Sequence, residues 1–475
     1  MRSVAAILCV TLVTGCQLAP RHIRPPLPTA PVYPAEYSRD AAPGSPATAI
    51  GWRDFLRDPR LEALITAALT RNRDLVIAVA EVEEARGFYR IQNAERLPVI
   101  GVSADATRSR VGASSIPGAP AGAGAVTFNR FSIGVGVSAF ELDFWGRVRN
   151  LSEAARSQFL STVHAQRAFR LALIREVAGT YLVAVEAAER IRLAEATVDS
   201  RREALRIARV RFTAGITSEL DYRQAESLLT QAETELAALR LTRARAENAL
   251  AVLVGGPIGG ALPDALPLAQ QLNGLTLSGG LPSELLVARP DIIAAEERLR
   301  AASANIGAAR AAFFPSISLT GDIGFASGEL SKLVGGDNRT WSYGPSINLP
   351  IFNLGGKRGN LTVAQARKNI AVAGYELAIQ TAFEEVADAL AGRRYFADQV
   401  AAQERGTAAQ RQIAALARIR YNEGVVSFLQ VLDAERNLFA AEQALLQVRR
   451  AEVENLVTLY IALGGGAIEQ RGTQQ

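Results

Sequence analysis

Apolar residues alternate with small polar residues in four short stretches of the chain, and this period of two predicts β-strands. The stretches are about 99–108, 131–140, 316–325 and 340–350. Each has roughly ten residues, the length of a tilted transmembrane strand. In the second stretch the apolar face carries Phe131, Ile133, Val135, Val137 and Ala139. The opposite faces are almost all Ser, Gly, Asn, Asp and Thr, which favours a membrane barrel with a polar lumen over a soluble sandwich.

Two proline-free stretches, about 152–211 and 359–421, predict unusually long helices. The first would be roughly 90 Å long at about 1.5 Å per residue, too long for a globular core. Each precedes a partner helix, at about 217–254 and 427–463. The partners show apolar residues at spacings of four and three, which predicts coiled-coil packing. The first seam is Ala225, Leu229, Ala232, Leu236, Leu239, Ala246, Leu250 and Leu253, interrupted at Arg243. The second is Ala434, Leu438, Ala441, Leu445, Val448, Leu459 and Ala462, interrupted at Glu452 and Asn455.

The body of the chain consists of two copies of one unit, each with a helix, a strand pair and two long helices. Arg211-Phe212-x-x-Gly215 recurs about 210 residues later as Arg420-Tyr421-x-x-Gly424. We therefore expect a first repeat at 51–256, a linker at 257–288, a second repeat at 289–465 and a tail at 466–475. Four strands cannot close a barrel, whereas three copies would pool twelve. This predicts a homotrimer.

The N-terminus has the features of a lipoprotein signal peptide, expected at 1–15. A basic residue precedes an apolar run that ends in Leu12-Val13-Thr14-Gly15-Cys16, which resembles a bacterial lipobox. Cys16 would then carry lipid, and a Pro-rich tether would follow within 16–50. Residue 17 is Gln, which resembles sorting to the outer membrane. The alternative is an ordinary signal peptide with an incidental cysteine.

Composition excludes several classes of function. The formal charge of +5 is modest, and basic residues are interleaved with acidic ones, so we expect no nucleic-acid partner. The two cysteines lie at the N-terminus and the chain has two histidines, so no metal site or cofactor is expected. No catalytic triad or phosphate loop is present, and we expect no enzyme activity.

Longer motifs resemble the outer-membrane factor family, the TolC-like efflux channels, and especially its NodT-type lipoprotein branch. The resemblance covers about 10–465 and is carried by Trp52, Phe55, Asp58, Pro59, Arg289-Pro290-Asp291-Ile292, Ala304-Asn305, Gly307 and Phe313-Phe314-Pro315. It implies a mainly α fold with a homotrimeric 12-stranded outer-membrane β-barrel, four strands per protomer. A long periplasmic α-helical coiled-coil barrel and a mixed α/β equatorial belt would complete the fold.

The resemblance also implies a periplasmic aperture and docking tips. The aperture residues would be Leu429, Asp433, Asp221, Tyr421, Arg420 and Arg211. The hairpin tips that dock an adaptor would include Phe212, Gly215 and Gly424. Asp433 would form an acidic ring in the trimer. Many relatives carry a second acid where this chain has Gln430, so a double ring is not expected.

The implied function is the passive exit of drugs or other small solutes through the outer membrane. The partners would be outer-membrane lipid, a periplasmic membrane-fusion adaptor and an inner-membrane pump of the resistance-nodulation-division (RND) class. One alternative within the family is a type I protein-secretion duct. An alternative of another class is a periplasmic coiled-coil adaptor, which would lack the four amphipathic strands.

Overall fold

The computed structural model describes residues 17–34, 36, 45–112, 124–258, 262–271, 277–278 and 282–468. Cys16 and the signal peptide lie outside them. The chain forms two compact units, and each unit takes corresponding parts of both repeats. The first unit comprises residues up to Pro25, Glu83–Thr162 and Ala295–Gly374. The second comprises Pro26–Val82, Val163–Ala294 and Tyr375–Gln475.

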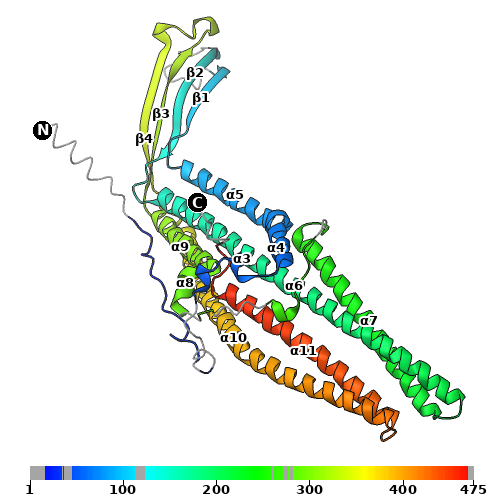
Figure 1. Ribbon diagram of the computed structural model, residues 1–475. Helices are drawn as coiled ribbons and strands as arrows, with labels where there is room; N and C mark the ends of the chain where they lie inside the picture. Colours follow the sequence, from blue (N-terminus) through cyan, green and yellow to red (C-terminus); the bar gives the residue numbers. More distant parts are fainter. Residues whose placement is uncertain are drawn as a thin grey trace, which may run out of the picture. The chain divides into compact units, whose positions relative to one another are not determined.

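The first unit contains one antiparallel sheet in the order β1-β2-β3-β4 (Figure 1). The strands are β1 (Ile100–Val111), β2 (Val126–Glu141), β3 (Ser316–Ser327) and β4 (Arg339–Asn348). All four strands predicted from the alternation are present. The largest difference is at β2, which begins five residues before the predicted start because its apolar residues become less regular there.

Strand register places the apolar residues of all four strands on one face of the sheet. Val102 lies opposite Val135, Val135 opposite Ile323, and Ile323 opposite Trp341. The neighbouring residues Gly136 and Asp322 are paired on the other face. The sheet therefore has one apolar face and one face of small polar residues, as predicted.

A β-bulge in β2 corrects one part of the predicted alternation. The register shifts between Val137 and Phe140, and Ala139 takes a positive φ of 53°. Phe140, rather than Ala139, lies opposite Leu319 on the apolar face. The N–H of Ala139 donates to the Thr320 hydroxyl at 3.1 Å, so this backbone group is satisfied although the ladder is interrupted.

The helices follow the predicted order in both repeats (Figure 1). In the first repeat they are α3 (Trp52–Phe55), α4 (Pro59–Arg71), α5 (Arg73–Ala94), α6 (Arg147–Thr213) and α7 (Glu219–Val254). In the second they are α8 (Leu285–Ala288), α9 (Pro290–Ala311), α10 (Leu354–Asn422) and α11 (Phe428–Ala462). Among the described residues, no helix combines the length and apolarity needed to cross a bilayer.

The first predicted coiled-coil seam is buried, whereas the second is only partly so. On α7 the buried residues are Ala225, Leu229, Ala232, Leu236, Leu239, Ala246, Leu250 and Val254. Val254 thus replaces the predicted Leu253. On α11 only Ala434, Leu459 and Ala462 of the predicted seam are buried. Asn455, which interrupts this seam, donates to the Ala389 carbonyl of α10 at 2.9 Å.

Candidate functional site: the hairpin tips

The two long helix hairpins of the second unit end in identical turns. Gly215 has φ 71°, its N–H donates to the Phe212 carbonyl, and the next N–H donates to the Arg211 carbonyl at 2.8 Å. Gly424 has φ 72° and makes the same pair of bonds with Tyr421 and Arg420. These are the two hydrogen bonds of a Schellman motif, which requires the left-handed conformation that glycine adopts easily.

One polar contact joins the two tips within the protomer. The Arg211 guanidinium donates to the Tyr421 hydroxyl, and its central carbon lies 5.4 Å from the centre of the Tyr421 ring. The Tyr421 ring in turn contacts Phe428, with ring centroids 5.2 Å apart. The structure thus brings together two of the predicted aperture residues. The side chain of a third, Arg420, is exposed.

Asp221 is engaged by its own turn. Its carboxylate accepts hydrogen bonds from Thr217 and Ser218, while its N–H donates to the Ser218 hydroxyl, forming a capping box at the start of α7. The hydrogen bonds from Thr217 and Ser218 lower the pKa of Asp221. The corresponding residue in the second repeat is Gln430, and Ser427 at the start of α11 makes no side-chain capping bond. A role for Asp221 in contacts between hairpins stays a prediction.

Leu429 and Asp433 lie one helical turn apart on an accessible face of α11. Leu429 is 42% exposed, whereas Val431 and Leu432 are buried. The Asp433 carboxylate lies 3.1 Å from the guanidinium of Arg436, a pairing that the sequence reasoning did not anticipate. Asp433 and Arg436 are three residues apart on one helix, and this spacing could have predicted their ion pair from the sequence. The acidic character of this face is therefore partly neutralised.

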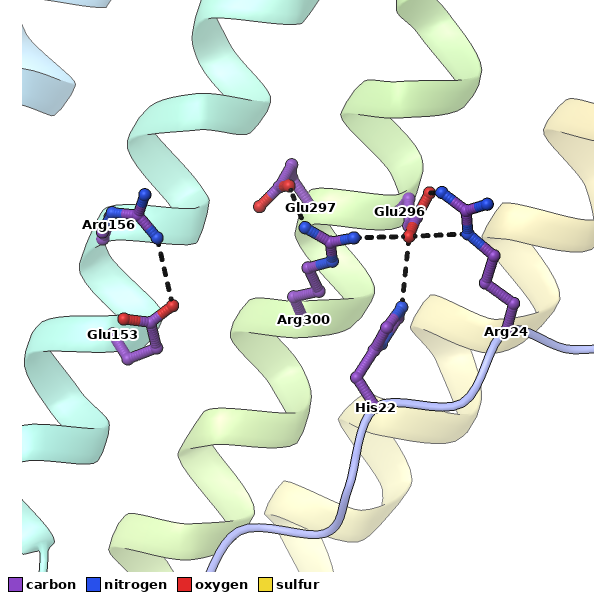
Figure 2. A network of polar contacts seen from close by, with 7 residues as sticks. All are labelled: His22, Arg24, Glu153, Arg156, Glu296, Glu297 and Arg300. Atoms are coloured by element: carbon purple, nitrogen blue, oxygen red, sulfur yellow. Dashed lines mark hydrogen bonds and ion pairs between the residues drawn. The ribbon is translucent and has the colours of Figure 1, made fainter. Parts of the chain in front are cut away.

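An ionic latch in the first unit was also missed from the sequence. The Glu296 carboxylate of α9 accepts two hydrogen bonds from Arg24, both at 3.0 Å, and lies 3.2 Å from His22 (Figure 2). Arg300 reaches it from the opposite side at 2.8 Å. Burial alone would raise the pKa of Glu296, but the Arg24 hydrogen bond and the Arg300 charge outweigh it and lower the pKa.

The segment that carries His22 and Arg24 runs along α9. Its Leu18 carbonyl accepts from Arg310 at 3.0 Å, near the end of α9 that leads into β3. A Cβ on Gly307 would come within 2.8 Å of Ala19, so glycine permits this close approach. Leu18 and Arg24 are six residues apart along an extended segment, and their partners Arg310 and Glu296 are fourteen residues apart along α9. Both separations span roughly 20 Å, so the extended segment lies parallel to the helix over this length. We call residues 17–25 the strap.

Two buried clusters of the second unit explain motifs that the sequence analysis had only recognised. The carboxylate of Asp58 is fully buried and accepts from the Tyr181 hydroxyl at 2.6 Å, Gln271 at 2.6 Å and the Leu266 N–H at 3.1 Å. It also caps the N-terminus of α4. Burial, and then the bond to Asp58, raises the pKa of Tyr181 far above its ordinary value, so this hydroxyl remains a donor.

Arg289 of the Arg-Pro-Asp motif forms the second cluster. Its guanidinium donates to both carboxylate oxygens of Asp291, at 3.1 and 2.6 Å. It also lies 2.6 Å from Glu385 of α10 and donates to the Ala462 carbonyl at the end of α11 at 3.3 Å. One side chain therefore ties the start of α9 to two long helices.

Comparisons with known proteins agree with this architecture. A family model described as outer membrane efflux protein matches residues 64–256 and 281–465. The chain is 42% identical over 463 residues to the solvent efflux pump outer membrane protein SrpC of Pseudomonas putida, covering 97% of each. It is 40% identical over 460 residues to the cation efflux system protein CusC of Escherichia coli K12, covering 96% of this chain and 98% of that protein. The open-state structure of the Neisseria gonorrhoeae MtrE outer membrane channel matches with a TM-score of 0.87 at 38% identity, covering 96% of this chain and 100% of that chain.

The fold and the matches define a protein of the outer membrane that acts as an efflux channel and not as an enzyme or a periplasmic adaptor. The chain belongs to the outer membrane efflux protein family. Its mainly helical, two-fold repeated fold is that of the trimeric channels, so the predicted fold class is confirmed.

Proposed function

We propose that three copies of this chain form the outer-membrane exit duct of a tripartite efflux system, which passively conducts small solutes from the periplasm to the outside. The sheet carries the proposal. Within the described residues, β1 and β4 each have one edge without a partner strand, and the sheet has an exposed apolar face. Open edges are not tolerated in lipid, whereas pairing β1 with β4 of a neighbouring copy would close a cylinder of twelve strands.

The hairpin tips support docking of a periplasmic membrane-fusion adaptor. Ile216 and Val425 directly follow the two turn glycines and are 75% and 65% exposed. Apolar side chains at equivalent positions of both tips suit a partner that contacts them in the same way. Together with Phe212, Gly215 and Gly424 they would form the adaptor-docking surface. Energy would come from an inner-membrane RND pump joined through that adaptor.

The choice of cargo would belong to the pump. The relatives described above are named for efflux of solvents and of cations, which are chemically unrelated cargoes. Neither is named for protein secretion, which favours small solutes over the type I alternative. A water-filled tube with a small polar lumen face suits such a range of cargo, because it need not bind any of them.

We predict that the Arg211–Tyr421 contact holds the aperture closed. Tyr421→Phe removes the hydroxyl that accepts from Arg211 and should raise the open fraction roughly fivefold per protomer, since a hydrogen bond contributes about 1 kcal/mol. Single-channel recordings in a planar bilayer give the open probability and, from it, the mean conductance. Arg223→Ala is the matched control, because the contacts of Arg223 among the described residues stay within its own helix. It pairs with Glu219 and Glu226, and its guanidinium lies 5.3 Å from the centre of the Tyr222 ring. Equal conductance of Tyr421→Phe and wild type would remove Tyr421 from the gate.

A second prediction concerns the acidic ring proposed at Asp433. Asp433→Ala should weaken channel block by a multivalent cation such as hexamminecobalt at least tenfold. Arg436→Ala should strengthen block, because it removes the cation that partly neutralises Asp433. Current traces recorded over a series of cation concentrations give both values. Glu442→Ala serves as the control, because its carboxylate pairs with Arg411 elsewhere on the hairpin. Block that is unchanged in both Asp433 and Arg436 variants places the ring elsewhere.

The strap supports the proposal that Cys16 is lipidated. The contact between Leu18 and Arg310 places the start of the strap near the end of α9 that enters the sheet, so a lipid at the preceding residues would meet the membrane surface. Globomycin, which inhibits lipoprotein signal peptidase, should leave a precursor that still carries the signal peptide. If the signal peptide of the Cys16→Ser variant were still cleaved before residue 16, the lipobox assignment would be contradicted.

We predict that Glu296 holds the strap in place. Glu296→Gln removes the anion shared by His22, Arg24 and Arg300 and should make trypsin cleavage after Arg21 at least fivefold faster in the purified protein. Glu153→Gln provides the control, because Glu153 pairs with Arg156 of its own helix and not with His22 or Arg24 of the strap (Figure 2). If both variants are cleaved at the wild-type rate, Glu296 does not hold the strap.

A further inference from the structure

The outward apolar face of the sheet is a band of limited height. At its lower border Ile317 lies opposite Ile347. At its upper border Phe131 lies opposite both Ser327 and Ala106. Ten residues of β3 separate these rows, roughly 33 Å along the strand and about 25 Å in height at a typical tilt. That is the height of the apolar band of outer-membrane barrels.

Arginines continue the same face directly above this band. β1 pairs with β2 without interruption from Ile100 to Val111, so Arg108 and Arg110 lie on the face of Ile100 and Val102. Both are exposed. A third arginine, Arg339, lies on the same face opposite Phe325, one row inside the upper border and next to Trp341. Among the described residues, no carboxylate is paired with these three arginines.

The topology identifies which leaflet these arginines meet. All four connections to helices α5, α6, α9 and α10 leave the sheet at its other end, through links of five residues or fewer. The arginine end carries only the connections between β1 and β2 and between β3 and β4 (Figure 1). Because the helices belong to the periplasmic side, the arginines reach the outer leaflet.

We infer that Arg108, Arg110 and Arg339 form a docking row for the phosphate groups of lipopolysaccharide. This inference rests on the proposed membrane-facing role of the apolar face. Lipopolysaccharide makes up the outer leaflet, and its phosphates lie at the border of the apolar layer, where the row is located. Guanidinium groups bind phosphate with two parallel hydrogen bonds, and aromatic residues such as Trp341 and Phe131 suit the same interface.

The chain supplies a matched control for the row. Arg130 lies opposite Thr107, one residue away along the strand, and therefore points to the small polar face with Ser132 and Gly134. It has the same charge at nearly the same height but the opposite orientation. A general attraction between basic protein and acidic lipid would involve Arg130 as much as Arg108 and Arg110. Specific docking on the outward face would not.

The test measures binding of fluorescently labelled lipopolysaccharide to the full-length purified protein in mild detergent. Arg108→Gln/Arg110→Gln should bind about 25-fold more weakly, since each arginine near an anionic lipid surface is worth about fivefold. Arg339→Gln should bind about fivefold more weakly, and Arg130→Gln should stay within twofold of wild type. Dephosphorylated lipopolysaccharide should bind wild type more weakly than the double variant binds the intact lipid, because all three arginines then lack their phosphate partners.

Three outcomes would overturn the docking row. They are wild-type binding by the double variant, an equal loss in Arg130→Gln, and competition by phosphatidylglycerol as strong as by lipopolysaccharide. Conductance in planar bilayers is recorded for the same proteins. Absence of conductance in the wild-type protein would refute the channel function. Normal conductance without a preference for lipopolysaccharide over phosphatidylglycerol would refute only the docking row.

Discussion

Asp58→Ala is expected to destabilise the protein more than any other single substitution considered, by about 4–6 kcal/mol. The Asp58 carboxylate is fully buried, and its loss leaves the Tyr181 hydroxyl and the Leu266 N–H without their acceptor. The Gln271 amide loses one of its two acceptors and keeps the Leu266 carbonyl. Each buried donor without a partner costs about 1–3 kcal/mol. The loss of the α4 cap adds about 1 kcal/mol. The midpoint of thermal or denaturant unfolding measures the effect.

A conservative variant and a surface control help to interpret this loss. Asp58→Asn keeps the shape and one acceptor oxygen, so it should lose about half as much. Asp74→Ala removes an exposed acid from the first turn of α5 and should cost less than 1 kcal/mol. A loss in Asp58→Ala no larger than in Asp74→Ala would mean that the cluster contributes little.

Arg289→Ala is expected to cost about 3 kcal/mol. The guanidinium side chain is only 11% exposed, and its removal leaves Asp291 and Glu385 without the cation that they share. Breaking a buried ion pair costs about 3–5 kcal/mol, and the partial exposure of both carboxylates places the effect at the lower end. The terminal carbonyl of α11 also loses a donor. Unfolding of the purified protein in guanidinium chloride measures the change.

The conservative variant distinguishes charge from geometry at this site. Arg289→Lys keeps the charge but cannot reach Asp291, Glu385 and the Ala462 carbonyl together, so it should recover less than half of the loss. Arg298→Ala is the control, because Arg298 lies exposed on α9, the helix that Arg289 directly precedes. If Arg289→Lys is as stable as wild type, the fork geometry does not matter.

The fold could be predicted from the sequence because its main signals are local and repeated. Period-two alternation locates the strands, and long proline-free stretches locate the helices. The bulge at Ala139 could not be predicted, because a positive φ at alanine carries no sequence signal and depends on the pairing with β3. The second seam is only partly buried within one protomer, and Gln443, which lies outside that seam, is buried on α11 and accepts a hydrogen bond from Arg190 of α6.

The candidate site was predictable only where residues lie close in sequence or match a family motif. The turns at Gly215 and Gly424 follow from glycine and helix length. The ionic latch joins His22 and Arg24 to Glu296, more than 270 residues away, and no local pattern links them. The Asp58 cluster likewise joins three distant segments. Sequence motifs marked Asp58 and Arg289 as family features, but only the structure shows that both act by holding helices together.

Closure between copies is the central claim, and disulfide cross-linking tests it most directly. β1 and β4 are separated by two strands within one sheet, roughly 14 Å, whereas a disulfide needs Cα atoms within about 7 Å. Three double variants would be made in a Cys9→Ser background. Each combines Ser103→Cys on β1 with one cysteine on β4, either Ser342→Cys, Gly344→Cys or Ser346→Cys. At least one pairing should give dimers and trimers on a denaturing gel, with nothing larger. Monomers alone in every pairing, or a ladder beyond three, would contradict the account.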